Sequence, residues 1–425
     1  MRILHLSWEY PPVVYGGLGR HVHALAEAQA ALGHDVVVLT QHEPDASPDE
    51  TVNGVRIIRV PQDPPLVPQT ELLAWVMGFG HGLARAGARL GREWEPDVVH
   101  GHDWLVAHAG AHLKTMFDVP LVATVHATEA GRHQGWLPGD LNRAIHTVEW
   151  WLTYEARRVI TCSSHMRWEV TRLFELPPDK VDVIPNGIDL DKWAVDEALV
   201  AAARTRYGRT GPLVLFTGRL EWEKGAHTLV EALHRLRELH PGATLVVAGR
   251  GSQEEELRTL ARQLGLVEHV HFTGWLPDDD LPALAAAADI AVVPSIYEPF
   301  GMAALESVAA GTPLVVADTG GLRELVEHGV TGVHFTPGDV DALVSAIASL
   351  LDDELLARRL LHEGRAVLLT RYRWGMVAER TDAVYREAVE DEAVLRTQSL
   401  ARGERPLRLA VVEGNLLTGE AESPA

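Results

Sequence analysis

The sequence contains a single cysteine, Cys162, among 425 residues. One cysteine excludes an intramolecular disulfide and any zinc module built from several cysteines. Cys162 closes the apolar run VITCSS, so we expect it to be a small buried residue of the core. The fold is therefore expected to form without covalent cross-links.

Positive charge is scarce. Lysine and arginine number 38 against 59 aspartates and glutamates, which gives a formal net charge of -21. Such a surface repels a phosphate backbone on average, so we expect no nucleic acid partner. A small anion remains possible where a few cations and helix N-termini meet in a cleft, because charges beyond about 10 Å are screened.

Long apolar runs are also missing. No stretch reaches the ~18 apolar residues of a membrane-spanning helix. The first residues lack the basic, apolar and small-residue order of a signal peptide. We therefore expect a cytoplasmic protein without membrane insertion.

The strict nicotinamide fingerprint G-x-G-x-x-G is absent. Residues 16–19 read GGLG, and residues 249–254 read GRGSQE, with glutamate in place of the third glycine. An oxidoreductase is therefore not favoured. The GGLG segment instead offers a turn without side chains at a helix start, where free amides and the helix dipole attract anions. A turn without any ligand is the alternative.

Short apolar runs alternate with amphipathic segments along the whole chain. RILHLSW, a helix near residues 18–32 and DVVVLT form a βαβ opening, and DVVHGHD, PLVATVH, RRVITCS and KVDVIPNG continue it. Strands that are apolar throughout favour a parallel sheet covered on both faces. We expect this first lobe to span residues 1–192.

A second series begins after a looser stretch. PLVLFTG, ATLVVAG, HVHFTG, DIAVVPS, PLVVAD and TGVHF predict a second doubly wound sheet, in a lobe over residues 208–372. We expect residues 373–395 to form a helix packed back on the first lobe, and residues 396–425 to form a flexible tail. The fold class is thus α/β, with two Rossmann-like lobes facing a cleft.

Two charged motifs follow strands of the second lobe. Arg219 and Lys224 in GRLEWEKG lie at the crevice end of the sheet, where two cations favour a phosphate. In SIYEPFGMAALE, Glu298 precedes a helix and Glu306 lies inside it, so both carboxylates suit sugar hydroxyls. The amides at the helix start suit phosphates, and they belong to Gly301, Met302 and Ala303. A solvated loop and a helix-capping glutamate are the structural alternatives.

Together these motifs resemble a retaining glycosyltransferase of family four, with the two-lobed B-type fold. The resemblance covers Met1 to about residue 392. Within the family, SWEYPPVVYGGLGRHV, GHDWLVA, HATEAGRHQGW and NGID look like the glycogen-synthase-like α-1,4-glucosyltransferases of actinobacterial type. One departure concerns the KTGGL motif of those synthases, because Val14 stands where they have lysine.

The resemblance implies roles for individual residues. Arg219 and Lys224 would hold the donor diphosphate, Glu298 the glucose hydroxyls and Glu306 the ribose hydroxyls. On the first lobe, His126 would contact the donor sugar, while the amides of Gly17 and Leu18 would reach the phosphates. The acceptor side would include His102, Asp103 and Trp136.

A metal site is not expected, although the chain has 22 histidines. HGHD and HVH lack the other ligands of a known zinc motif, and the D-x-D of Asp189 and Asp191 falls in the interlobe linker. The resemblance likewise implies catalysis without a metal or other cofactor. Trp136, in the polar loop GRHQGWLPGD, is the tryptophan that we most expect to stack on an acceptor sugar.

The resemblance thus implies an enzyme of glycogen biosynthesis that moves glucose from ADP- or UDP-glucose to an α-1,4-glucan or maltooligosaccharide. The alternatives are a family-four transferase that makes maltose 1-phosphate or a trehalose-type disaccharide, and a non-catalytic sensor of sugar nucleotides.

Overall fold

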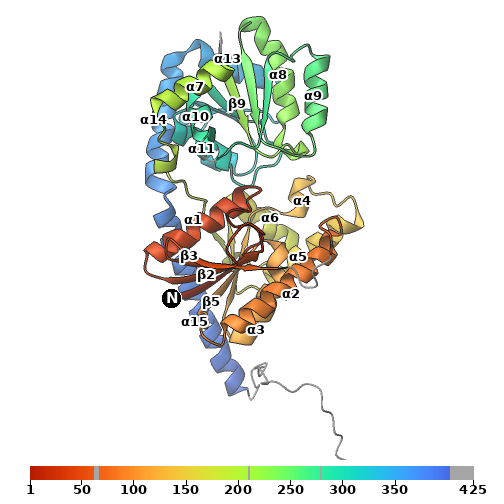
Figure 1. Cartoon of the computed structure of the whole chain (residues 1–425), viewed down its shortest axis with the longest axis vertical. Coiled ribbons are helices and arrows are strands. Elements are labelled where there is room, and N and C mark those ends of the chain that lie inside the picture. The colour runs from red at the N-terminus through yellow and green to blue at the C-terminus, as the bar shows by residue number, and fades with distance from the viewer. Residues whose placement is uncertain (62–66, 209–210, 278–279, 403–425) are drawn as a thin grey trace, which may run out of the picture.

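A computed structural model describes residues 1–61, 67–208, 211–277 and 280–402. The chain forms two α/β lobes, one above the other in Figure 1, each built on its own sheet. The expected architecture of two Rossmann-like lobes is therefore confirmed. Among the described residues, no helix has the length and apolarity needed to cross a bilayer.

The first lobe is built on an eight-stranded sheet in the order β3-β4-β2-β1-β5-β6-β7-β8. All neighbouring strands are parallel except the edge pair β3·β4, because a short turn at Asn53 and Gly54 joins those two strands. The strands are β1 (Arg2–Leu6), β2 (Asp35–Gln41), β3 (Asp49–Val52), β4 (Val55–Val60), β5 (Val98–His102), β6 (Leu121–Val125), β7 (Arg158–Thr161) and β8 (Val181–Val183).

Both faces of this sheet are covered by helices, which explains its apolar strands. Leu4 and Leu6 of β1 face a core shared with α2 (Leu72–Leu90), α3 (Ala107–Phe117), α5 (Asp140–Glu155) and α6 (Ser164–Phe174). Ile3, on the opposite face, packs with α1 (Gly17–Ala31) and α15 (Trp374–Ala401). The short helix α4 (Glu129–Arg132) follows β6 near the second lobe (Figure 1).

The second lobe has an all-parallel six-stranded sheet in the order β11-β10-β9-β12-β13-β14. Helices α8, α9 and α13 cover one face, and α7 and α10 cover the other. The strands are β9 (Leu213–Thr217), β10 (Thr244–Ala248), β11 (Val270–Gly274), β12 (Ile290–Val293), β13 (Leu314–Ala317) and β14 (Val333–Phe335). The helices are α7 (Glu197–Tyr207), α8 (Ala226–Leu239), α9 (Glu254–Gln263), α10 (Asp280–Ala287), α11 (Met302–Ala310), α12 (Leu322–Leu325), α13 (Val340–Asp352) and α14 (Glu354–Arg371).

The last helix returns to the first lobe, as expected. α15 packs against α1, and Tyr385 is fully buried there. The helix continues to Ala401, so it is longer than the segment 373–395 and includes the start of the expected tail. The rest of that tail, residues 403–425, lies outside the described residues.

The topology brings the sequence motifs to the same place. The strand order reverses between β1 and β5 in the first lobe and between β9 and β12 in the second. Ligands of open α/β sheets bind at the carboxyl ends of such strands. The chain segments after these four strands carry the GGLG turn, Asp103, Arg219 and Glu298.

Candidate active site between the lobes

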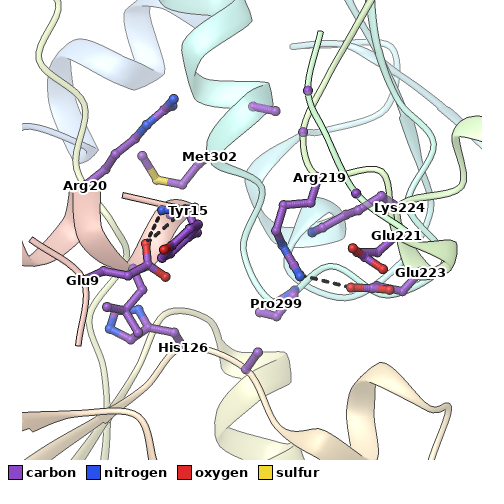
Figure 2. A pocket seen from close by; sticks show the side chains of 18 of the residues that line it. Glu9, Tyr15, Arg20, His126, Arg219, Glu221, Glu223, Lys224, Pro299 and Met302 are labelled. Carbon is purple, nitrogen blue, oxygen red and sulfur yellow. Dashed lines mark hydrogen bonds and ion pairs between the residues drawn. The ribbon is translucent and has the colours of Figure 1, made fainter. Parts of the chain in front are cut away.

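A cavity of about 1020 Å³ lies between the lobes and is lined by residues of both. Figure 2 shows Glu9, Tyr15 and His126 from the first lobe on one side of it, and Arg219 and Lys224 from the second lobe on the other. The structure thus brings the donor-side residues together with Asp103. The lining includes Gly17, Leu18, Asp103, His126, Arg219, Lys224, Glu298, Gly301, Met302, Ala303 and Glu306.

The two second-lobe cations are held by carboxylates. Arg219 follows β9, and its Nη2 donates to Glu223 Oε1 at 3.1 Å. Lys224 ends a 3₁₀ turn, η4 (Trp222–Lys224), and its Nζ donates to Glu298 Oε2 at 2.9 Å. Ser295 also donates to Glu298, at 3.0 Å. These contacts hold both cations at the cavity wall instead of leaving them in open solvent.

Helix α11 presents its N-terminus to the cavity. It begins at Met302 after Gly301, whose φ of 111° favours glycine, and a Cβ at Gly301 would lie 2.5 Å from Leu322 Cδ2. Within α11, Glu306 is almost fully buried and pairs with Arg20 of the first lobe, at 2.6 Å from Nη1 to Oε1. Glu306 is therefore part of an ion pair between the lobes, which the sequence did not predict.

The first-lobe loop before α1 folds around a carboxylate. Glu9 is buried, and its Oε2 accepts hydrogen bonds from the amides of Tyr15 at 2.8 Å and Gly16 at 3.1 Å. Burial raises the pKa of Glu9. Gly19 is needed here, because a Cβ on it would lie 2.9 Å from Glu9 Cβ. The glycines of SWEYPPVVYGGLG thus let the loop close over Glu9. Sequence reasoning did not single out this residue, although it stands three residues after β1.

The same turn meets the second lobe. A Cβ built on Gly17 would lie 3.5 Å from Met302 Cγ, so the first turn of α1 and the first turn of α11 approach each other across the cavity. Two helix N-termini therefore face one space, and both favour an anion there.

Asp103 and His126 form the first-lobe floor of the cavity. The His126 amide donates to Asp103 Oδ1 at 2.7 Å. Burial raises the pKa of Asp103 to about 7, despite the hydrogen bonds that it accepts. Burial also lowers the pKa of His126 to about 3, so its ring is neutral near pH 7.

Two expected acceptor residues do not reach the cavity. His102 is fully buried, and its ring nitrogens lie next to His5 and His126 instead. Trp136 is 69% exposed, and it is not among the residues that line the cavity. Trp104, which follows Asp103 directly, does line it and is the better placed indole. The sequence could not separate them, because a polar loop and a buried turn both tolerate tryptophan.

A group of buried histidines lies beneath the floor, and we call it the histidine cluster. His100 and His102 alternate on one face of β5, opposite His5 of β1, and the face is covered by α1 and α15. Ring contacts with centroids 4.1 to 5.7 Å apart connect five histidines, and His102 links the first three to the other two. Its members are His5, His21, His100, His102 and His126. His100 and His102 fall two residues apart in one expected strand, but the sequence could not show the convergence with residues from α1, β1 and the end of β6.

The linker motif D-x-D does not take part in this cavity. The amide of Asp191 donates to Asp189 Oδ1 at 3.1 Å, a local turn at the start of the 3₁₀ segment η3 (Asp191–Trp193). Neither aspartate lines the cavity between the lobes. The two carboxylates instead shape the connection into the second lobe.

Comparison with known proteins fits this geometry. Residues 15–192 match Glycosyltransferase Family 4, and residues 203–367 match Glycosyl transferases group 1. The chain is 48% identical over 405 residues to a glycogen synthase of Mycobacterium tuberculosis, covering 92% of this chain and 96% of that protein. The chain belongs to the family-four glycosyltransferases. It is therefore an enzyme, and the predictions of a glycosyltransferase and of a resemblance to glycogen synthases are confirmed.

Two more known proteins are similar to this glycosyltransferase. An alpha-maltose-1-phosphate synthase of Mycolicibacterium smegmatis is 32% identical over 415 residues, with 91% of this chain and 99% of that protein covered. The solved structure of a sucrose-phosphate synthase from Thermosynechococcus elongatus is 27% identical, with a TM-score of 0.78 over 91% of this chain and 99% of that one.

Proposed function

We propose that this glycosyltransferase moves glucose from ADP- or UDP-glucose to the non-reducing end of an α-1,4-glucan or maltooligosaccharide, with retention at the anomeric carbon. The observation that carries the proposal is the convergence of Arg219, Lys224 and the N-terminus of α11 on the cavity wall opposite the GGLG turn. The 48% identity to a glycogen synthase supports a glucan acceptor.

Departure of the diphosphate is the step that these groups assist. The bond between the anomeric carbon and the phosphate oxygen breaks, and negative charge grows on that oxygen. Arg219, Lys224 and the first amides of α11 then stabilise the leaving group in a preorganised site. We propose that this stabilisation takes the place of a metal ion in the transfer step. The Lys224 ammonium would donate hydrogen bonds to both Glu298 and the phosphate.

The pairing of Glu298 and Glu306 argues against their use as the nucleophile and acid of a covalent glycosyl-enzyme. Retaining glycosidases use two carboxyl groups about 5 to 5.5 Å apart, one as nucleophile and one as acid. Here Glu298 is paired with Lys224 and Glu306 with Arg20. We therefore infer front-face displacement. The acceptor oxygen bonds to the anomeric carbon on the side that the phosphate leaves, and the acceptor proton passes to the departing phosphate oxygen.

The first lobe would supply the sugar and acceptor contacts. In this proposal Glu298 binds glucose hydroxyls, Glu306 lies near the ribose, and the neutral His126 ring borders the donor sugar. Asp103 and Trp104 line the acceptor side, where an indole face suits a sugar face. We also propose a cytoplasmic location, which suits a chain with one buried unpaired thiol.

A screen of donors against acceptors tests the function. ADP-glucose and UDP-glucose are each mixed with maltooligosaccharide, glucose or glucose 1-phosphate, and nucleotide release is measured together with product length. We expect release with maltooligosaccharide and products longer by single glucose units. Release only with glucose 1-phosphate would contradict the glucan proposal and support the maltose-1-phosphate alternative, which the 32% identical synthase makes the second candidate.

The same screen addresses the donor base. Val14 lines the cavity where glycogen synthases of the resembled type carry lysine, so the donor preference linked to that lysine does not transfer to this chain. The ratio of kcat/KM for the two nucleotides gives the preference directly. Ligand-induced stabilisation without any nucleotide release would contradict turnover altogether.

A further inference from the structure

The histidine cluster beneath the cavity has more hydrogen-bond acceptors than donors. His5 Nε2 lies 2.8 Å from Gln29 Oε1, an oxygen that only accepts, so His5 carries its proton on Nε2. His5 Nδ1 is then an acceptor, and His102 Nε2 donates to it at 3.0 Å. A neutral His102 is left with a lone pair on Nδ1.

His21 also has a ring nitrogen whose lone pair lacks a donor. Its Nδ1 lies 2.8 Å from Asn186 Oδ1 and therefore carries the proton. The other nitrogen, Nε2, then holds a lone pair. It is buried and has no hydrogen-bond partner among the described residues. His21 as a whole is only 3% exposed, so bulk water does not supply the missing donor.

The third ring at this place is His126, whose Nε2 lies 3.3 Å from His102 Nδ1. A single N–H on that atom can satisfy the lone pair of His102 or that of His21, but not both. A buried acceptor without a donor costs about 1–3 kcal/mol. A cation that accepts electron pairs from all three rings removes the shortfall.

We propose that His21, His102 and His126 bind one divalent transition-metal ion of the kind that prefers imidazole nitrogen, such as Zn²⁺. One nitrogen from each of the three lies within 4.8 Å of the others. Around a tetrahedral ion with Zn–N near 2.0–2.1 Å, neighbouring nitrogens are about 3.3 Å apart. The His102–His126 pair already has this spacing, and the ligand atom of His21 lies within 4.8 Å of both, so a shift of at most about 1.5 Å completes the set.

The surroundings resemble those of a metal-binding site. Metal-binding histidines usually donate their other N–H to a carbonyl or carboxylate, which fixes the ring. Here Asn186 Oδ1 orients His21, and the path from His102 through His5 to Gln29 orients His102. His126 lines the cavity, so an ion can enter the trio from that side.

A second set of three histidines in the cluster is not a candidate metal site. His5, His100 and His102 also bring nitrogens within 4.8 Å of one another. Both nitrogens of His100 have partners, however, with Nδ1 2.6 Å from Tyr385 Oη and Nε2 2.7 Å from Thr124 Oγ1. Both nitrogens of His5 are occupied as well. Only the trio with His21 leaves a lone pair without a partner.

The proposed ion would lie at the cavity floor, next to the place where His126 borders the donor sugar, and away from the diphosphate. It would join α1, β5 and the segment after β6, and so fix the cavity floor, while the diphosphate is stabilised from the second lobe. Its binding requires neither donor nor acceptor, so it can fail or succeed independently of the proposed glucosyl transfer.

Metal binding by the full-length protein tests the inference. The protein is stripped with a chelator, dialysed and titrated with Zn²⁺ by calorimetry, and with Co²⁺ by visible absorption. We expect one ion per chain, the strong d–d bands of Co²⁺ in a tetrahedral nitrogen site, and a higher Tm with Zn²⁺, because the ion binds the folded state. Absence of stoichiometric binding by the wild-type protein would overturn the proposal.

Variants locate the site. His21→Leu fills the same buried space without a nitrogen, and we expect it to lose the Co²⁺ bands and the Zn²⁺ effect on Tm. His328→Gln, at an exposed histidine of the second lobe, is the matched control and should bind like wild type. If His21→Leu does not fold, Asn186→Ala decides, with an expected loss of 10–100-fold in affinity. Unchanged binding in a folded His21→Leu or Asn186→Ala protein would place the ion elsewhere and refute the proposal.

Discussion

Lys224 is the residue whose chemistry the proposed mechanism depends on most directly. Its ammonium group lies between Glu298 and the cavity, where a departing phosphate would take up part of its hydrogen bonding. A charge-assisted hydrogen bond contributes about 1.5–3 kcal/mol, so we expect Lys224→Ala to lower kcat by about 10- to 100-fold. Initial rates of nucleotide release, with circular dichroism to verify folding, measure this.

The matched control is Lys192→Ala, at an exposed lysine of the interlobe segment, which should leave the rate unchanged. A Lys224→Ala protein that turns over within twofold of wild type would show that its ammonium does not stabilise the leaving group.

Glu149 gives a prediction for pH dependence. Burial raises its pKa from the ordinary 4.5 to about 7. Its Oε1 accepts from the Glu129 amide at 2.8 Å, while Oε2 is buried with His146 Nδ1 at 3.8 Å, beyond hydrogen-bond distance. Between pH 4.5 and 7 the folded state therefore keeps a proton that the unfolded chain has lost, so this group makes stability fall as pH rises, with a plateau above about pH 7.

Glu149→Gln removes this titration while keeping the acceptor for Glu129. We expect the variant and the wild type to have similar free energies of unfolding near pH 5, and the variant to be more stable by about 1–3 kcal/mol at pH 8. Urea denaturation at the two pH values measures the difference. If the difference in stability between the variant and the wild type is the same at pH 8 as at pH 5, Glu149 is not protonated in the folded state.

At the scale of elements, the sequence predicted the strands well, because apolar runs bounded by Gly, Asp or Pro mark buried parallel strands. The βαβ opening, the restart near residue 212 and the returning helix all correspond to observed elements. Strand ends at the switch points then placed Arg219, Glu298 and Asp103 at one cavity, since topology alone fixes that edge.

Contacts between distant elements could not be predicted from the sequence. The pairing of Arg20 with Glu306, the burial of Glu9 under its own loop and the gathering of five histidines each depend on how two or more elements pack. Periodicity gives the face of an element, but it does not say which side chain of another element lies opposite. The place of Trp136 was missed for the same reason, because its exposed side chain is not among the residues that line the cavity.

Helix α15 offers a test at this scale. Tyr385 is its anchor in the first lobe, fully buried, with its hydroxyl 2.6 Å from His100 Nδ1 and accepting from Gln29 Nε2 at 3.2 Å. Tyr385→Phe keeps the packing but leaves both polar groups without this partner, so we expect a loss of about 1–3 kcal/mol in the free energy of unfolding. Chemical denaturation measures it. Arg386→Ala, at the exposed neighbouring residue, is the control and should lower the free energy of unfolding by much less. Equal losses in both variants would contradict the anchoring role of Tyr385.

At the scale of the whole molecule, the two lobes are joined by charged contacts around the cavity. Arg20 of α1 pairs with Glu306 of α11, and Arg132 of α4 lies 3.7 Å from Glu223, which also holds Arg219. Closure of two lobes over a donor excludes water and so protects the sugar from hydrolysis. The same contacts that shape the site therefore also set how readily it closes.

Breaking the Arg20–Glu306 pair tests this link between closure and donor binding. Arg20→Met keeps most of the aliphatic stem and removes the charge, and a partly buried pair of this kind is worth about 1 kcal/mol. Because the open form is then more populated, we expect the KM for the nucleotide sugar to rise about 3- to 10-fold. We also expect the radius of gyration from small-angle scattering to increase. Arg235→Met, which breaks a pair inside the second lobe, is the control and should change neither quantity. An Arg20→Met protein with unchanged scattering and unchanged KM would mean that closure does not depend on this pair.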